Sequence, residues 1–207
     1  MNNQSSSGHV KSMDMESDDT SLPNMAETSD RACLTKKKKK KRRRVTVTVG
    51  TTGGSERLAG LIELLRSMDD VVKSVNFREI PYNVRDMDQV EFDDMEVFIL
   101  CHSITNRRLS ITDVQDALYD NLLQRACRKL GKKNVIIIAY DLDELQPNDL
   151  EIRLNAFRIQ QPTACRKSSA VVFAGQCASS PPELPEDQQN KLCSSLQKAT
   201  QKCCAIL

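Results

Sequence analysis

Five short apolar runs are separated by longer stretches in which apolar residues recur at helical spacing. β-Branched residues fill 45–49, a dense apolar run covers 95–101, and 134–140 is the most apolar segment of all. Weaker strand patterns cover 71–77 and 170–174. The hydrophobic pattern therefore predicts five β-strands, of which the third and fourth are buried on both faces.

Helices are predicted between and after these strands. The first begins at Ser55, which we expect to cap it, and continues through apolar residues spaced three or four apart. Further helices are predicted over 112–130, 148–159 and 186–202. Gly131 is expected to end the helix over 112–130.

Alternating strands and helices with continuously apolar strands are typical of an α/β protein. We predict a three-layer sandwich with an open, mostly parallel five-stranded sheet. The predicted strand order is 2-1-3-4-5, as in flavodoxin-like folds. Ligands of such sheets bind beyond the carboxyl ends of the strands.

The charges are unevenly distributed along the 207 residues. Residues 1–35 are rich in Ser, Asp, Asn and Thr, and their low hydrophobicity predicts disorder. A polybasic segment follows at 36–44, then the α/β domain at 45–202 and a short tail at 203–207. Because 11 of the 30 basic residues but only six of the 28 acidic ones precede the domain, the domain itself is mildly acidic. We therefore do not expect nucleic acid as a partner.

The eight cysteines form no Cys-x-x-Cys pair and no His cluster accompanies them, so no metal site is predicted. No apolar stretch is long enough to span a bilayer, and the first residues lack the apolar core of a signal peptide. We expect a cytosolic protein with reduced thiols and no cofactor.

The last four residues, Cys204-Ala205-Ile206-Leu207, match a C-a-a-X prenylation box. A terminal leucine favours geranylgeranyl, so Cys204 is the predicted lipid acceptor and a protein prenyltransferase is a predicted partner. The adjacent Cys203 is a candidate for palmitoylation. A single prenyl chain is a marginal anchor that usually needs a second signal.

The polybasic segment is a candidate for that second signal, because clustered cations bind anionic membrane surfaces. An alternative interpretation is a nuclear localisation signal, which would give a nuclear protein. The segment consists of nine consecutive cations: Lys36, Lys37, Lys38, Lys39, Lys40, Lys41, Arg42, Arg43 and Arg44.

A second alternative function uses the loop Gly50–Ser55, which follows the first strand and precedes a helix. A glycine-rich turn at such a place can hold a phosphate, and nearby arginines can neutralise it. The protein would then be a nucleotide- or phosphate-binding switch or enzyme. Its candidate ligands are Thr52, Gly53, Gly54, Ser55, Arg107 and Arg108.

The tail resembles that of prenylated small GTPases of the Ras and Ral type, which implies membrane anchoring. The resemblance covers the tail alone, because the phosphate loop G-x-x-x-x-G-K-[ST] and the base-reading Asn-Lys-x-Asp motif are absent. GTP hydrolysis is therefore not expected.

Two further resemblances concern the domain. Thr52, Gly53 and Ser55 match part of the flavodoxin phosphate loop, but Gly50 replaces its first hydroxyl residue. The segment ending in His102 is similar to the caspase strand that ends in the catalytic histidine, yet the next strand is followed by Asp141 and not by a cysteine nucleophile. The caspase resemblance implies shared architecture without the protease activity, whereas the partial flavodoxin loop leaves FMN as an alternative ligand with weak support.

The sequence as a whole favours a peripheral membrane protein that acts as a non-catalytic interaction or signalling module at the cytoplasmic face of a membrane. Its protein partner is not identified by any motif. Because the polybasic segment precedes the first strand and a helix follows the last, both anchors are expected at the amino ends of the strands.

Overall fold

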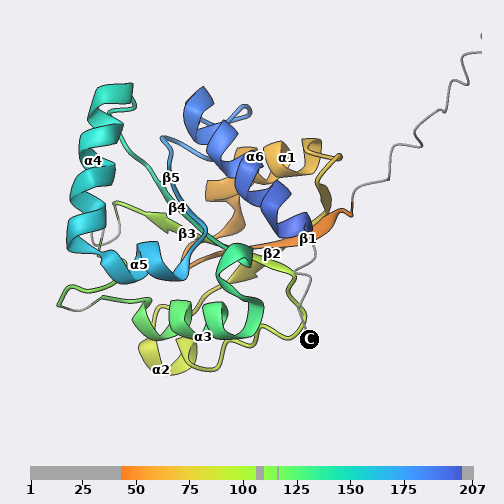
Figure 1. Ribbon diagram of the computed structural model, residues 1–207, viewed down its shortest axis with the longest axis vertical. Helices are drawn as coiled ribbons and strands as arrows, with labels where there is room; N and C mark the ends of the chain where they lie inside the picture. Colours follow the sequence, from red (N-terminus) through yellow and green to blue (C-terminus); the bar gives the residue numbers. More distant parts are fainter. Residues whose placement is uncertain (1–42, 106–109, 116, 202–207) are drawn as a thin grey trace, which may run out of the picture. The chain divides into compact units, whose positions relative to one another are not determined.

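A parallel sheet of five strands forms the centre of the protein in a computed structural model that describes residues 43–105, 110–115 and 117–201. Its order is β2-β1-β3-β4-β5, with every neighbouring pair parallel, which confirms the predicted class and topology (Figure 1). The strands are β1 (Val45–Thr51), β2 (Val72–Glu79), β3 (Val97–Ser103), β4 (Val135–Tyr140) and β5 (Ala170–Phe173).

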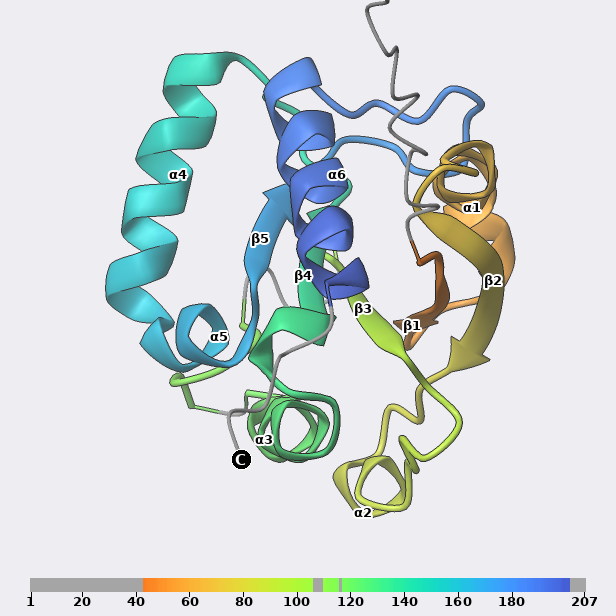
Figure 2. The ribbon, with the colours of Figure 1, turned by 45° about the vertical axis from the view of Figure 1, so that its right-hand side comes forward.

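Helices cover both faces of the sheet and complete the three-layer sandwich (Figure 2). One face packs against α1 (Ala59–Ser67), which follows the 3-10 turn η1 (Ser55–Leu58), and against α6 (Glu186–Thr200). The opposite face carries α2 (Val84–Met87), α3 (Asp120–Leu130), α4 (Pro147–Gln160) and α5 (Pro162–Lys167). A second 3-10 turn, η2 (Lys132–Asn134), leads from α3 into β4.

Strand periodicity explains how the two cores are filled. Ile99 points to the α1 and α6 side, whereas its neighbours Phe98 and Leu100 point to the other side, and all three are fully buried. β3 and β4 are buried at every position. Strands covered on both faces need apolar residues throughout, which is why their sequences lack alternation.

The helix predicted over 112–130 is wrong in its first eight residues, because α3 begins only at Asp120. The Gln161 side chain accepts the N–H groups of Ile111 and Thr112, both at 2.9 Å, which ties this segment to a residue 49 and 50 positions later in the chain. Asp113 has a left-handed φ of 60° and accepts a hydrogen bond from the Thr163 N–H at 2.6 Å. Long-range polar contacts thus outweigh the apolar spacing.

Of the two predicted helix caps, the structure confirms the one at Gly131 and contradicts the one at Ser55. Gly131 follows α3 with φ of 82°, a value that glycine adopts without strain, so the predicted C-cap is confirmed. Ser55 does not cap α1. It is the first residue of η1, whose N-cap is Gly54, and no side-chain cap hydrogen bond is made there.

Candidate functional site

Because the sheet is parallel, its two edges collect different ends of the strands. We call the side where the strands begin the amino edge and the side where they end the carboxyl edge. The predicted phosphate loop belongs to the carboxyl edge. Arg43 and Arg44 of the polybasic segment precede β1 and belong to the amino edge. Residues 36–42 of that segment, together with Arg107, Arg108, Cys203 and Cys204, lie outside the described residues.

The loop after β1 contains the groups predicted to hold a phosphate, and two of its glycines have neighbours that bear on that prediction. The Gly53 N–H already donates to the Thr51 hydroxyl at 3.3 Å. The Glu56 carboxylate lies against Gly54, since a Cβ added there would be 2.1 Å from Oε2. Ser55 begins a turn of only four residues. A carboxylate therefore lies at Gly54, whereas the cationic Arg57 side chain approaches Gly53, with its Cδ 3.6 Å from an added Cβ.

A cavity of about 600 Å³ beside this loop is also acidic. Its described lining includes the carboxylates of Asp141, Asp143 and Glu183, whereas Arg57 is its one cation. Asp141 has a left-handed φ of 66° and accepts a hydrogen bond from the Ser103 hydroxyl. The described lining thus has a net negative charge, whereas the predicted counter-charges Arg107 and Arg108 lie outside the described residues.

The histidine at the end of β3 occupies a structural position. His102 is buried, and its Nδ1 lies 3.3 Å from the Tyr119 hydroxyl, with the two rings packed edge to face. Burial raises the pKa of Tyr119 to about 12, although a hydrogen bond with Thr52 opposes the shift. The phenol therefore stays protonated and neutral at physiological pH.

The two cysteines buried near this edge are not in the thiolate form. Burial raises the pKa of Cys101 well above its usual range and that of Cys177 to about 12. A cysteine nucleophile needs a lowered pKa and a partner that takes its proton. Within the described residues, no group of three or more His, Cys, Asp or Glu side chains could hold a metal ion either.

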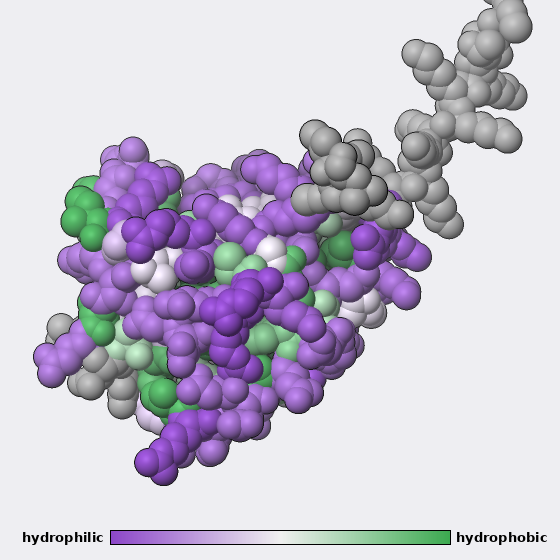
Figure 3. Space-filling model, turned by 60° about the horizontal axis from the view of Figure 1, so that its bottom comes forward, coloured by the Kyte–Doolittle hydropathy of each residue, from purple (hydrophilic) through white to green (hydrophobic). Residues whose placement is uncertain are grey.

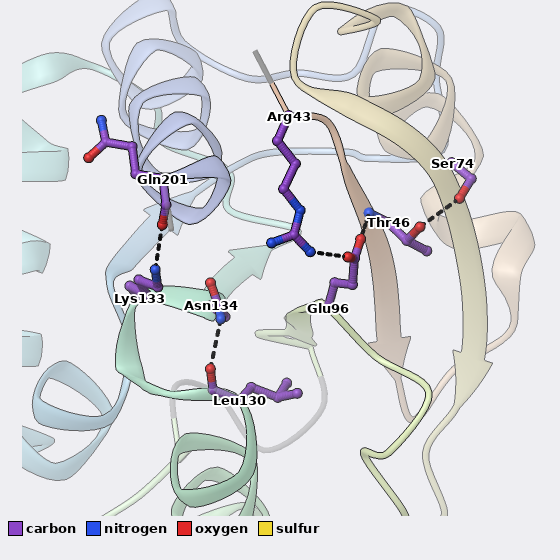
Figure 4. Close-up of polar contacts among 8 residues, drawn as sticks. All are labelled: Arg43, Thr46, Ser74, Glu96, Leu130, Lys133, Asn134 and Gln201. Carbon is purple, nitrogen blue, oxygen red and sulfur yellow. Dashed lines mark hydrogen bonds and ion pairs between the residues drawn. The ribbon is translucent and has the colours of Figure 1, made fainter. Parts of the chain in front are cut away.

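At the amino edge, Arg43 is held by a carboxylate. Its guanidinium donates to Glu96 Oε1 at 2.5 Å, and Glu96 Oε2 accepts the Thr46 N–H at 2.7 Å (Figure 4). The Thr46 N–H is the main cause of a lowered pKa for Glu96, and Arg43 lowers it further against the opposing effect of burial. Arg44 reaches the Asp69 carbonyl at 3.4 Å. The residue that enters β1 is thus paired with the residue that precedes β3.

The described carboxyl-terminal residues are held at the same edge. The Lys133 ammonium donates to the Gln201 carbonyl at 2.6 Å, and Asn134 Nδ2 donates to the Leu130 carbonyl at 2.7 Å (Figure 4). η2 therefore connects the end of α6 to the end of α3. Arg43 and Gln201 line one cavity of about 360 Å³ at this edge, so the two ends of the described domain meet there.

Hydrophilic residues dominate the surface seen when the bottom of Figure 1 is turned forward (Figure 3). Hydrophobic residues among the described part of that face form small separate areas. In addition, none of the described helices combines the length and apolar character needed to cross a bilayer.

Sequence reasoning found Arg43 and Arg44 but missed their neighbours at the amino edge: Glu96, Lys129, Lys133, Asn134 and Gln201. A usable signal was present, because residues that immediately precede parallel strands share one edge of the sheet. Glu96 precedes β3 and Asn134 precedes β4.

No family model matches this sequence, and a search of the curated proteins found no match. The functional argument consequently rests on the two edges of the sheet.

Proposed function

We propose that this protein is a peripheral membrane protein anchored by a geranylgeranyl group on Cys204 and by the polybasic segment Lys36–Arg44. Cys203 is a candidate for an additional palmitoyl group. The α/β domain then acts at the cytoplasmic face of a membrane as a non-catalytic interaction or signalling module. The carboxyl-edge cavity would face away from the bilayer, toward protein partners.

The meeting of Arg43 and Gln201 at one cavity carries this proposal. Arg43 is the residue after Arg42 in the polybasic segment, and Gln201 is three residues before Cys204. Both anchors therefore begin at the amino edge. Two weak anchors that start from one place reinforce each other, because binding of the first raises the effective concentration of the second.

The expected membrane-binding energies indicate that stable attachment needs both anchors. One prenyl chain alone gives marginal and reversible membrane binding. Each Lys or Arg close to an anionic leaflet contributes about 1 kcal/mol at most, and the contribution falls off within a Debye length. We thus expect stable attachment from the combination and partial release when either signal is removed.

Fluorescent fusions at the amino terminus test the proposal in eukaryotic cells. Cys204→Ser should release the protein from membranes, and replacement of Lys36–Lys41 by glutamine should weaken attachment. Cys193→Ser, in α6, is the matched control and should leave the distribution unchanged. An unchanged distribution of the Cys204→Ser fusion would refute the proposal.

Intact-mass measurement of protein from the same cells separates membrane anchoring from the nuclear alternative. Prenylation predicts an added geranylgeranyl group and loss of Ala205, Ile206 and Leu207. An unmodified tail together with nuclear accumulation that depends on Lys36–Arg44 would favour the nuclear alternative.

A further inference from the structure

Two cavities lie between α4 and α6, beside β5, which is an edge strand of the sheet (Figure 2). They have volumes of about 750 and 150 Å³ and share Leu154 in their linings. We call the two together the α4–α6 groove. The edge of β5 is not open to another strand, because Val172 and Phe173 are fully buried and the Phe173 N–H donates to the Gln188 side chain at 3.1 Å. Side chains must therefore provide any recognition in the groove.

The groove is positively charged at one end. Arg158 of α4 and Lys191 of α6 line the smaller cavity together with Ser168 and Ser169, and no carboxylate is among its described lining residues. Neither cation belongs to an ion pair within the described part of the chain. The Arg158 guanidinium donates to the neutral Asn155 side chain at 3.2 Å, a contact that uses one of its five N–H donors. Two neighbouring cations without a carboxylate favour an external anion.

The Lys191 ammonium is in an unfavourable environment without such an anion. Burial lowers its pKa, and repulsion from Arg158 lowers it further, whereas attraction by Asp187 opposes the shift. The Asp187 carboxylate, one helical turn before Lys191, instead accepts a hydrogen bond from the Gln188 side chain at 2.7 Å. An anion that contacts both cations would relieve their repulsion, and a phosphate group with two negative charges matches two cations.

The opposite end of the groove is negatively charged, and its middle is apolar. The carboxylates of Glu151, Glu186 and Asp187 line the larger cavity, and no cation is among its described lining residues. Its apolar lining residues are Leu145, Pro147, Leu150, Leu154 and Pro185. The charge of the groove therefore changes sign from one end to the other, with apolar side chains between the two ends.

α4 exposes further apolar surface next to the groove. Ile152 and Ile159 are 67% and 81% exposed. Each follows a groove residue, Glu151 or Arg158, by one position, so both isoleucines lie on the adjoining side of the helix. Large exposed aliphatic side chains beside an apolar groove indicate a surface that a protein partner covers.

We propose that the α4–α6 groove binds an extended segment of a partner protein that has a phosphorylated side chain, then apolar side chains, then a basic side chain. The phosphate contacts Lys191 and Arg158. The apolar side chains pack against Leu154, and the basic side chain pairs with Glu151. Because Glu151 and Arg158 are about 10 Å apart along α4, an extended segment covers the distance in about three residues. This inference rests on the proposed role as an interaction module and names the chemistry of its partner.

Calorimetric titration with a synthetic peptide tests the groove. The peptide contains phosphoserine, two leucines and two arginines in that order, and a second peptide with the reversed sequence covers the opposite chain direction. The protein is the full chain with Lys36–Lys41 replaced by glutamine, because the polybasic segment would itself attract the phosphate. We expect one of the two peptides to bind, and its unphosphorylated form to bind about tenfold more weakly, the effect of losing one charge-assisted hydrogen bond.

Substitutions in the groove locate the bound peptide. Lys191→Gln should remove the difference in affinity between the phosphorylated and unphosphorylated forms, and Arg158→Gln should reduce it. Lys198→Gln is the matched control, because Lys198 is exposed on the same helix and lies outside the lining of both cavities. Glu151→Gln should weaken binding by about threefold, yet have no effect when alanines replace the arginines of the peptide.

Three outcomes would overturn the inference: equal binding of the phosphorylated and unphosphorylated forms, no binding of either peptide direction at millimolar concentration, or equal effects of Lys191→Gln and Lys198→Gln. A peptide with aspartate in place of phosphoserine identifies the anion, and an affinity equal to that of the phosphorylated form would also contradict the proposal. None of these results bears on the release of the Cys204→Ser fusion from membranes. Failure of the groove and failure of the anchor are therefore distinguishable.

Discussion

Glu96 connects the entry of the chain to the sheet, and its replacement tests whether the amino edge is built as described. Its carboxylate accepts the Thr46 N–H at 2.7 Å and pairs with Arg43 at 2.5 Å. Thr46 lies one residue before the first β1–β3 pair, Val47 and Val97. Glu96 therefore extends the contact between these strands beyond their backbone ladder, and we expect Glu96→Ala to destabilise the domain.

The size of the expected stability loss depends on how far the Glu96 side chain is exposed to solvent. A hydrogen bond to a charged group contributes about 1.5–3 kcal/mol. The Glu96 side chain is 38% exposed, so solvent reduces this figure, and its exposed pair with Arg43 adds less than about 1 kcal/mol. We expect Glu96→Ala to lower the free energy of unfolding by about 1–2 kcal/mol. Glu96→Gln should cost about 1 kcal/mol, because its amide oxygen still accepts the Thr46 N–H.

The sign of the pH dependence is determined by the lowered pKa of Glu96. A carboxylate whose pKa is lower in the folded state stabilises the protein above its unfolded pKa, near 4.5, and this contribution is lost as the pH falls through the folded pKa. Glutamine does not titrate. The difference in stability between the wild type and Glu96→Gln should therefore shrink in acid.

Urea denaturation followed by circular dichroism, at neutral pH and at several values below 4.5, measures both effects. Glu63→Gln, at an exposed position on α1, is the control for loss of one surface carboxylate. The reasoning is refuted if Glu96→Gln is as stable as the wild type at neutral pH, or if its deficit persists unchanged in acid.

Three further predictions concern the packing and the carboxyl edge. Gly60→Ala should destabilise the domain by about 2 kcal/mol in thermal denaturation, because its Cβ would lie 1.6 Å from the Ser179 carbonyl oxygen, whereas Gly53→Ala should be tolerated. Asp113→Ala should cost about 2 kcal/mol in urea denaturation, since it removes the acceptor for Thr163 at a left-handed position; Asp113→Asn should cost less. Cys177, whose pKa burial raises to about 12, should resist alkylation at neutral pH, whereas the partly exposed Cys193 should be labelled, as peptide mass spectrometry would show. Equal labelling of both would contradict this.

The strands were predictable because their patterns are local. Five runs of apolar residues correspond to five strands, and alternation with helices is enough to predict a parallel sheet. The start of α3 was not predictable in the same way. Gln161 and Thr163 contact residues about 50 positions earlier in the chain, and no spacing of apolar residues within 111–119 carries that information.

The candidate phosphate site likewise depends both on local sequence and on residues that are distant along the chain. Glycines after β1 suggested a phosphate site, but the sequence did not show that the Glu56 carboxylate would lie against Gly54 or that Asp141 and Glu183 would line the same cavity. These carboxylates come from separate loops that the sheet brings together at its carboxyl edge.

The sequence by itself determined the class of the fold and suggested the two anchoring signals that we propose, because strand periodicity, a C-a-a-X motif and a charge run each lie within a few consecutive residues. Only the tertiary structure decided that Arg43 and Gln201 share one cavity and that Lys133 and Asn134 complete it. The physical reason is that a parallel sheet gathers the beginnings of distant strands at one edge, and the last helix runs back to that edge. The nine cations and Cys204 are thereby assigned a common starting point in our proposal, which neither segment specifies alone.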